Sequence, residues 1–270
     1  MTRICVFVPV KNGMPLIQDT IGSIIGQTAF RDLQVTLCIC DGQSVDGTLR
    51  YAKEIEGKCT DVGIKYLLVS RADHGMYDGM SYAMGVVGLD HDIYCYINAG
   101  DYFSPYAFRE VALLFRRKIQ WVTGLNAYYN QRGVLTRTVL PVAYPSDLIR
   151  QGFFGALLPF IQQESTFWSV DLQAKIDLRR LAGYRFAGDA YLWYTFSQFE
   201  TLVIAKAWLS GFRQHEGQLS AARMAEYRQE FNSIRDRRAL LSYVKAGVIW
   251  GLLRLPQSFK LALSRSIVRV

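Results

Sequence analysis

The sequence of 270 residues has few of the residues that usually hold zinc or build disulfide frameworks. It contains 3 histidines and 5 cysteines, and no two cysteines form a C-x-x-C pair. No histidine lies at ligand spacing from a cysteine, so a zinc site is not expected. The number of cysteines is odd, and four of them lie in or beside apolar runs. This pattern predicts buried thiols in a reducing compartment.

Long hydrophobic runs and a secretion signal are also missing. No run reaches the roughly 18 uninterrupted apolar residues that a membrane-spanning helix needs. The chain begins with Met-Thr-Arg and a strand-like run, without the positive, apolar and small segments of a signal peptide. We therefore expect a cytoplasmic protein. Half of the residues are hydrophobic and 13% are aromatic, which is enough for a substantial core.

Acidic residues are scarce in the last part of the chain. The net charge is +8, and residues 223–270 contain 10 Lys and Arg against 3 Asp and Glu. The first 222 residues hold 21 against 20, so the basic character belongs to the C-terminal segment.

Strands and helices alternate with short links in the first half, which predicts an α/β protein with a mainly parallel sheet. Residues 4–10 form a continuous apolar run, as expected for a central strand covered on both faces. Helices are predicted to start near Pro15, Thr48, Met76 and Pro105. Further strands are predicted at residues 33–40, 65–69, 93–97 and 121–125.

The alternation weakens after Asn126. The expected elements are a hairpin over 128–139, a glycine-broken pocket wall or loop over 152–160, a helix from Asp189, a strand over 201–209, a polar loop over 211–220, one helix over 222–255, and a short last helix after Pro256.

Three carboxylates follow predicted strand ends or open a helix: Asp41, Asp101 and Asp189. In an open α/β sheet, ligands bind beyond the carboxyl ends of the strands. A transferase acting on nucleotide sugars needs groups there to recognise the base, to hold a cation against the diphosphate and to deprotonate the acceptor hydroxyl. Alone, each carboxylate is also compatible with a turn or a helix cap.

Several stretches together resemble the inverting glycosyltransferases of family 2, which have the GT-A fold, and in particular those that build bacterial envelope polysaccharides. The resemblance extends over about four-fifths of the chain and is carried by residues 6–12, 41–48, 73–78, 97–101, 163–167, 187–193 and 211–220. Each stretch is weak evidence, whereas their co-occurrence in this order is specific.

The resemblance implies a role for particular side chains. Asp189 would be the catalytic base, and Asp101 would bind Mg²⁺ or Mn²⁺. The remaining implied residues would bind the donor: Pro9 and Asp41 at the base, Asp73 and Asp78 around the ribose and sugar, and Arg213 and His215 on a closing loop. For Asp78, a solvated position on a helix is the alternative.

The chain departs from the family pattern at two positions. The metal motif, which often has two or three acidic residues, is Asn-Ala-Gly-Asp here, with Asp101 alone. One carboxylate still suits a divalent cation, because the diphosphate and water can complete the shell. Gly188 stands before Asp189, where many relatives have a glutamate.

The basic segment predicts two domains, with a catalytic domain over 1–221 and C-terminal helices over 222–270. Basic residues interleaved with Leu and Trp favour a helix on the anionic inner face of the membrane. Packing on the catalytic domain or a homo-oligomer contact is the alternative, and nucleic-acid binding is not expected.

The predicted function is transfer of a sugar, with inversion, from a nucleotide-sugar donor to a carbohydrate or lipid-linked acceptor. The alternatives are a sugar-nucleotide pyrophosphorylase and a non-catalytic, membrane-docked scaffold of the same fold. The sequence does not identify the sugar, the nucleotide or the acceptor.

Overall fold

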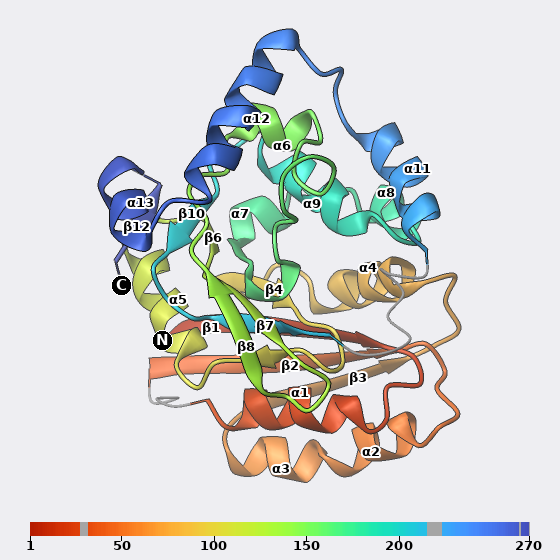
Figure 1. The fold of residues 1–270 in the computed structure, drawn as a ribbon. Coiled ribbons are helices and arrows are strands. Elements are labelled where there is room, and N and C mark those ends of the chain that lie inside the picture. Colours follow the sequence, from red (N-terminus) through yellow and green to blue (C-terminus); the bar gives the residue numbers. More distant parts are fainter. Residues whose placement is uncertain (28–31, 215–222, 265, 270) are drawn as a thin grey trace.

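The protein is an α/β structure built around one large sheet (Figure 1). The computed structural model describes residues 1–27, 32–214, 223–264 and 266–269. Within these residues, the eight strands of the large sheet lie in the order β12 (Ile267–Val268), β10 (Val203–Ala205), β6 (Trp121–Thr123), β9 (Phe167–Ser169), β4 (Ile93–Tyr96), β1 (Thr2–Val10), β2 (Leu33–Asp41) and β3 (Lys65–Ser70).

The N-terminal half of the sheet is parallel, as predicted. Strand β1 pairs with β2 and β4, and β2 pairs with β3, all in the parallel direction. Strand β9 is antiparallel to both β4 and β6, and the alternating pattern of the sequence did not predict it. The carboxyl ends of β1, β2 and β4 consequently lie together at one edge of the sheet.

Helices cover both faces of this sheet (Figure 1). Helices α1, α2 and α3 lie on one face, and α4 lies on the other. The helices are α1 (Leu16–Ile25), α2 (Thr48–Glu54), α3 (Glu56–Asp61), α4 (Met76–Val87), α5 (Ala107–Arg116), α6 (Ser146–Arg150), α7 (Val170–Gln173), α8 (Leu178–Ala182), α9 (Gly188–Phe196), α11 (Met224–Ile234), α12 (Leu240–Leu252) and α13 (Gln257–Leu263), with a 3₁₀ turn η2 (Gln163–Ser165).

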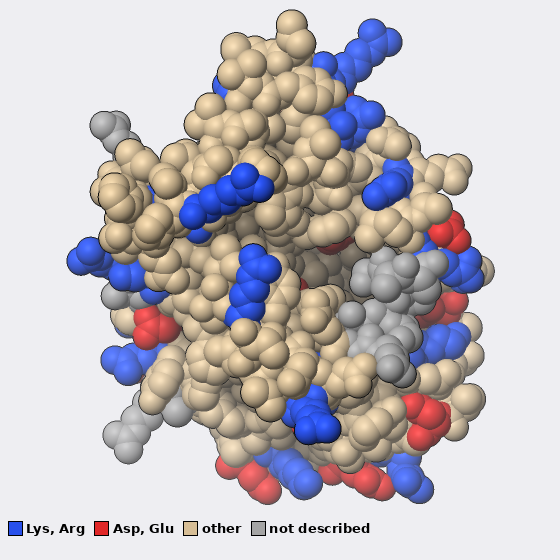
Figure 2. All heavy atoms as spheres, viewed as in Figure 1, with Lys and Arg blue, Asp and Glu red and all other residues tan. Residues whose placement is uncertain are grey.

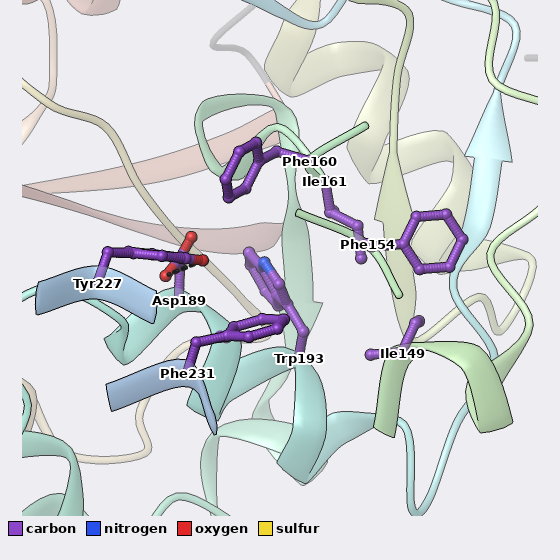
Figure 3. A pocket seen from close by; sticks show the side chains of 9 residues that line it. Ile149, Phe154, Phe160, Ile161, Asp189, Trp193, Tyr227 and Phe231 are labelled. Atoms are coloured by element: carbon purple, nitrogen blue, oxygen red, sulfur yellow. Dashed lines mark hydrogen bonds between the residues drawn. The ribbon is translucent and has the colours of Figure 1, made fainter. Parts of the chain in front are cut away.

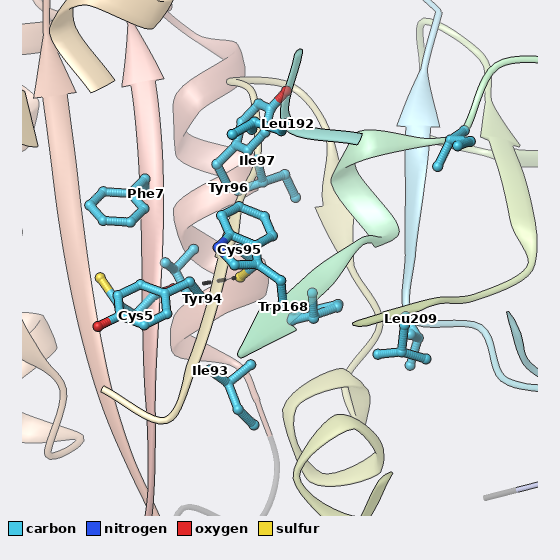
Figure 4. Packing of buried hydrophobic residues seen from close by; sticks show 14 of the residues in the cluster. Cys5, Phe7, Ile93, Tyr94, Cys95, Tyr96, Ile97, Trp168, Leu192 and Leu209 are labelled. Carbon is cyan, nitrogen blue, oxygen red and sulfur yellow. Dashed lines mark hydrogen bonds between the residues drawn. The ribbon is translucent and has the colours of Figure 1, made fainter. Parts of the chain in front are cut away.

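Large aromatic side chains fill the core between the strands and α9 (Figure 4). The ring of Trp168 in β9 lies 6.4 Å from that of Tyr96 in β4 and 5.5 Å from that of Phe196 in α9. All three side chains are buried. This packing fixes α9, which carries Asp189, against the end of β4, which leads to Asp101.

A smaller sheet covers the strand ends. Its described strands lie in the order β5 (Tyr102–Phe103), β11 (Ser210–Arg213), β7 (Asn126–Tyr129) and β8 (Leu135–Val139). The hairpin predicted over 128–139 is present as β7 and β8. The loop predicted over 211–220 is wrong at its start, because Phe212 and Arg213 pair with Tyr128 and Tyr129 of β7.

The C-terminal segment is helical, but the single helix predicted over 222–255 is wrong. The backbone is extended at Arg235 and at Ala239, so that α11 and α12 are separate helices. Strand β12 then pairs with β10 and extends the large sheet. The predicted division at residue 221 stays a prediction, although this segment packs on α6 and α9 and supplies a strand. In the described residues, no helix has the length and apolar character needed to span a bilayer.

Candidate active site

Asp41 ends β2 beside the last residue of β1, Val10. Its side chain is 1% exposed and accepts hydrogen bonds from the Ser44 main-chain N–H at 3.2 Å and from the Ser70 hydroxyl at 2.7 Å. Pro9 is buried one residue earlier in β1, opposite Cys40. The structure therefore brings Pro9 and Asp41 together at the strand ends, where the predicted base pocket would lie.

The main-chain N–H groups of the link between β1 and α1 are already hydrogen-bonded to other parts of the protein. The N–H groups of Asn12, Gly13 and Met14 donate to the side chains of Ser44, Thr48 and Asp46 at 2.8, 2.9 and 2.9 Å. A phosphate-binding loop needs such N–H groups to point at its ligand. The link is thus built to hold the loop after β2, and it is not a phosphate cradle.

Asp73 lies against the loop that follows Asp41. A Cβ atom at Gly42 would come within 2.6 Å of Asp73 Oδ2, and one at Gly79 would come within 2.9 Å. Glycine at both positions leaves room for this carboxylate. Asp41 and Asp73 therefore share one part of the site, as the predicted donor pocket requires.

Asp78 has a structural role in the link before α4. Its carboxylate pairs with the Arg71 guanidinium at 3.3 Å and accepts the His74 main-chain N–H at 3.0 Å. The side chain is 16% exposed. These contacts fix the loop that carries Asp73, so Asp78 shapes the donor side of the site through its neighbours.

Asp101 lies in the link between β4 and β5. It is 4% exposed, and its Oδ1 accepts the main-chain N–H of Arg213 at 2.9 Å. Burial raises the pKa of Asp101 to about 7, and the Arg213 hydrogen bond and charge only partly oppose that rise. A buried carboxylate that is costly to ionise would gain from a bound cation, because the positive charge stabilises the ionised form.

The guanidinium of Arg213 is held by other groups. It forms an ion pair with Asp19 of α1 at 2.7 Å and donates to the Gln131 carbonyl at 3.1 Å. Through its main chain and side chain, Arg213 joins Asp101 to α1 and to the β7–β8 turn. His215, the other residue predicted on this loop, lies outside the described residues.

Glu164 lies in η2 as a third buried carboxyl, to which the sequence assigned no role. It is 2% exposed, and its Oε1 atom has no hydrogen-bond partner. Burial, followed by the negative charges of Asp101 and Asp189, raises its pKa well above the ordinary value. Burial and these two charges therefore favour the neutral form of the Glu164 carboxyl.

Asp189 occupies the first turn of α9 and lines the cavity described below. Burial raises its pKa to about 6, while hydrogen bonds from the Ala190 N–H and the Tyr227 hydroxyl lower it. An aspartate with such a pKa is mostly ionised at neutral pH and is a stronger base than an exposed one. This is the property that a general base needs.

Helix α11 positions Asp189, which the sequence did not reveal. The Tyr227 hydroxyl lies 3.5 Å from Asp189 Oδ1. The Glu230 carboxylate accepts three main-chain N–H groups, those of Arg185, Phe186 and Ala187, at 2.8 to 2.9 Å. These donors immediately precede α9, so the basic C-terminal segment holds the start of the helix that carries Asp189.

The glycine before Asp189 also has a structural explanation. A Cβ atom at Gly188 would come within 2.5 Å of the Tyr77 ring of α4. The glutamate that many relatives have at this position has no room here. The Tyr77 hydroxyl lies 3.3 Å from that of Tyr96, so the ring is anchored in the core.

A cavity opens directly over Asp189 (Figure 3). It comprises about 310 Å³ of empty space, a figure that includes open solvent, and it is lined by Asp189 together with Ile149, Phe154, Phe160, Ile161, Ala190, Trp193, Tyr227 and Phe231. The predicted pocket wall over 152–160 therefore contributes two phenylalanines. Figure 2 shows a hollow on this face of the molecule with acidic side chains deep inside it.

The site suits a divalent cation whose coordination shell is completed by the diphosphate of the substrate and by water. No group of three His, Cys, Asp or Glu side chains in the described part of the chain is placed to hold a metal ion. Asp101 is the carboxylate that the strand end presents for this purpose, and hard cations prefer carboxylate and phosphate oxygens. Tight binding without a nucleotide is not expected.

The sequence matches no protein-family model and no curated protein. Solved structures do match. TarS 1–349 from S. aureus, in complex with UDP-GlcNAc, is 14% identical with a TM-score of 0.60, over 96% of this chain and 69% of that chain. The mannosyltransferase PcManGT from Pyrobaculum calidifontis, in complex with GDP-Man and Mn²⁺, is 17% identical with a TM-score of 0.58, over 96% and 72%.

Mannosyl-3-phosphoglycerate synthase from Rubrobacter xylanophilus is similar too, at 17% identity and a TM-score of 0.53, over 88% of this chain and 77% of that chain. In other TarS structures, this chain spans 37%, 60% and 61% of the matched chain. At such identities the likeness concerns the fold. The predicted fold is confirmed: this chain has the GT-A fold of glycosyltransferases.

Proposed function

We propose that this protein is an inverting glycosyltransferase that moves a sugar from a nucleotide-sugar donor to a carbohydrate or lipid-linked acceptor hydroxyl. The observation that carries the proposal is a pair of aspartates, the buried Asp101 and the partly exposed Asp189, whose pKa values desolvation raises to about 7 and about 6. The charges of both raise the pKa of Glu164, in a fold whose solved members include nucleotide-sugar complexes.

Donor binding is assigned to the strand ends. Asp41 would accept a hydrogen bond from the base, with Pro9 beside it. Asp73 would face the ribose, held in place by the Asp78–Arg71 pair. Arg213 and His215 belong to the segment predicted to close over the diphosphate.

Asp101 would hold Mg²⁺ or Mn²⁺. When bound, such a cation neutralises the charge that accumulates on the departing diphosphate. The main-chain N–H of Arg213 orients the Asp101 carboxylate for this role, because it occupies Oδ1. Asp189 would take the proton of the acceptor hydroxyl as that hydroxyl attacks the anomeric carbon. The attack comes from the side opposite the departing diphosphate, which inverts the configuration of that carbon.

Two rival functions are less well supported. A sugar-nucleotide pyrophosphorylase would bind phosphate at the loop after its first strand, whereas the N–H groups of Asn12, Gly13 and Met14 are already paired. A non-catalytic scaffold would not need a carboxylate with a raised pKa in the wall of a mostly apolar cavity, since desolvating Asp189 costs stability.

We also propose that α12 docks on an anionic membrane surface. Leu240, Leu241 and Val244 are 86%, 67% and 62% exposed, and the Arg254 guanidinium stacks on the exposed Trp250 ring. Some cations of the segment serve other purposes: Lys245 pairs with Asp147, and the buried Lys260 binds the Leu140 carbonyl. The apolar side chains therefore carry more of the docking than the sequence suggested. In the cell this would place the protein at the cytoplasmic face, in envelope polysaccharide synthesis.

The deciding experiment is release of nucleoside diphosphate from a panel of UDP-, GDP- and dTDP-sugars with Mn²⁺, comparing the wild type with Asp101→Asn. Asp147→Asn is the matched control, because it removes a surface carboxylate of α6. Metal-dependent release that Asp101→Asn alone abolishes supports the proposal. The proposal is wrong if no donor is turned over and calorimetry also detects no donor binding. Binding without turnover, with a full set of acceptors, would support the scaffold.

A further inference from the structure

The cavity over Asp189 contains a second polar group that nothing in the protein uses. Trp193 follows Asp189 by four residues on α9, so both side chains lie on the same face of the helix. Both line the cavity, and Figure 3 shows the indole ring extending from α9 into this space. Trp193 is 4% exposed, and its Nε1 atom has no hydrogen-bond partner among the residues that the structure describes.

The indole cannot easily turn to find a partner, because other rings hold it. Its centroid lies 5.8 Å from that of Trp121, 6.3 Å from that of Trp168 and 6.0 Å from that of Phe196. A buried N–H group without a partner costs free energy and is uncommon in native proteins. A rigid, unpaired donor beside the base is thus suited to an acceptor atom of the substrate.

The rest of the cavity restricts what that acceptor atom can be. Apart from Asp189, Trp193 and Tyr227, the lining side chains are apolar, and the Tyr227 hydroxyl is directed to Asp189. A substrate hydroxyl that accepted the indole N–H would bring its own hydrogen into apolar surroundings, where a donor left unpaired is costly. A carbonyl oxygen carries no hydrogen, and a methyl group attached to it would suit the aromatic walls.

We propose that this cavity is an acceptor subsite for an acetylated sugar, in which Trp193 Nε1 donates to the acetyl carbonyl while Asp189 receives the reacting hydroxyl. The acetyl methyl group packs against the aromatic walls, chiefly Phe160 and Phe231. Phe160 is 40% exposed, so the remainder of the acceptor can extend past it into solvent. This inference rests on the proposed function and names the class of acceptor for the same site.

The test follows the indole signals of protein labelled with ¹⁵N at tryptophan, which contains 5 Trp residues. Trp193→Phe assigns the Trp193 signal by its loss. Methyl glycosides of N-acetylglucosamine and N-acetylgalactosamine are titrated against those of glucose and galactose, with and without UDP or GDP and Mn²⁺. We expect a downfield shift of the Trp193 proton with an acetylated sugar and little or none with its hydroxyl counterpart.

Trp208→Phe is the control, because Trp208 is 38% exposed and does not line the cavity. It should leave the sugar response of Trp193 intact. In transfer assays, Trp193→Phe should raise the KM of the acetylated acceptor about 10-fold or more.

Two results would overturn the inference: no shift of the Trp193 signal with any sugar, or equal shifts with acetylated and hydroxyl sugars. Because these signals report binding, they remain readable even if no donor is turned over. If the protein transfers sugar but gives either of these two results, the acetyl subsite alone is rejected. If no donor in the panel releases nucleoside diphosphate but the Trp193 signal shifts only with acetylated sugars, the proposed transfer alone is rejected.

Discussion

The hydroxyl of Tyr227 lies 3.5 Å from Oδ1 of Asp189, although 38 residues separate them in the chain. Tyr227 belongs to α11, whose Glu230 also holds the main chain that leads into α9. One helix of the basic segment thereby controls both the position and the proton affinity of the carboxylate proposed as base.

Removing the Tyr227 hydroxyl should move the pH dependence of transfer. The hydrogen bond from this hydroxyl lowers the Asp189 pKa, so Tyr227→Phe should raise it above about 6. The acid limb of the pH profile of kcat should shift to higher pH, with little change above about pH 8 because Asp189 is ionised there. Phe231→Leu, one turn further along α11, is the control and should leave the midpoint unchanged. If the acid limb does not shift in Tyr227→Phe, the Tyr227 hydroxyl does not influence the pKa of the base.

Replacing the base should remove chemistry and keep the donor. Asp189→Asn retains the side-chain volume but cannot accept the acceptor proton, so kcat should fall by about 10²–10⁴-fold. The dissociation constant of the nucleotide sugar, measured by calorimetry, should change by less than about threefold, since the donor residues lie at the strand ends. Unchanged turnover would remove Asp189 from the mechanism.

Stability without metal should fall as the pH rises, because of Asp101. The reference pKa of an aspartate is 3.8, and the pKa of Asp101 in the folded protein is about 7. Between these two pH values, the folded state therefore binds more protons than the unfolded chain. The free energy of unfolding then decreases from about pH 4 to about pH 7. Urea unfolding of Asp101→Asn should show a weaker decline over this range than the wild type. Mn²⁺ with a nucleoside diphosphate should stabilise the wild type more at pH 7.5 than at pH 5, by about 1 kcal/mol or more. A pH slope equal in both proteins would contradict this account.

Much of this arrangement could be predicted from the sequence. The strand ends carrying Asp41 and Asp101 follow continuous apolar runs, and such runs are strong signals of buried parallel strands. Strand β11 could not be predicted, because its residues become a strand only through distant partners: Gly211 pairs with β5, and Phe212 and Arg213 pair with β7. Glu164 and Trp193 are ordinary residues in the sequence, and only the fold shows that a polar atom of each is buried and unpaired.

The close packing at Gly188 predicts a large effect from one methyl group. Gly188→Ala would place a Cβ atom 2.5 Å from the anchored Tyr77 ring, and overpacking of this kind costs about 1–3 kcal/mol. Gly22→Ala in α1 is the control, because nothing lies within 4 Å of its new Cβ atom, and it should be neutral or stabilising by up to about 1 kcal/mol. Urea unfolding compares the two variants. Equal stabilities would mean that Tyr77 can move aside.

Membrane docking should depend on the exposed apolar side chains of α12. Leu241→Gln combined with Val244→Gln should weaken binding to vesicles containing phosphatidylglycerol at least about 10-fold, since each substitution removes apolar surface that would enter the interface. Leu89→Gln, at a residue 53% exposed after α4, should have no effect on co-sedimentation. Wild-type protein that stays in the supernatant at low salt would reject the docking surface.

The hydrogen bonds that Tyr227 donates and Glu230 accepts also set an order of events during synthesis. As the ribosome extends the chain from its N-terminus, the large sheet can begin to assemble while residues 224–234 are still inside the exit tunnel. The proposed base would then lack the contacts that orient it and lower its pKa. A nascent chain would thus form the ends of β1, β2 and β4 first, and Asp189 would gain these contacts only once residues 224–234 have emerged.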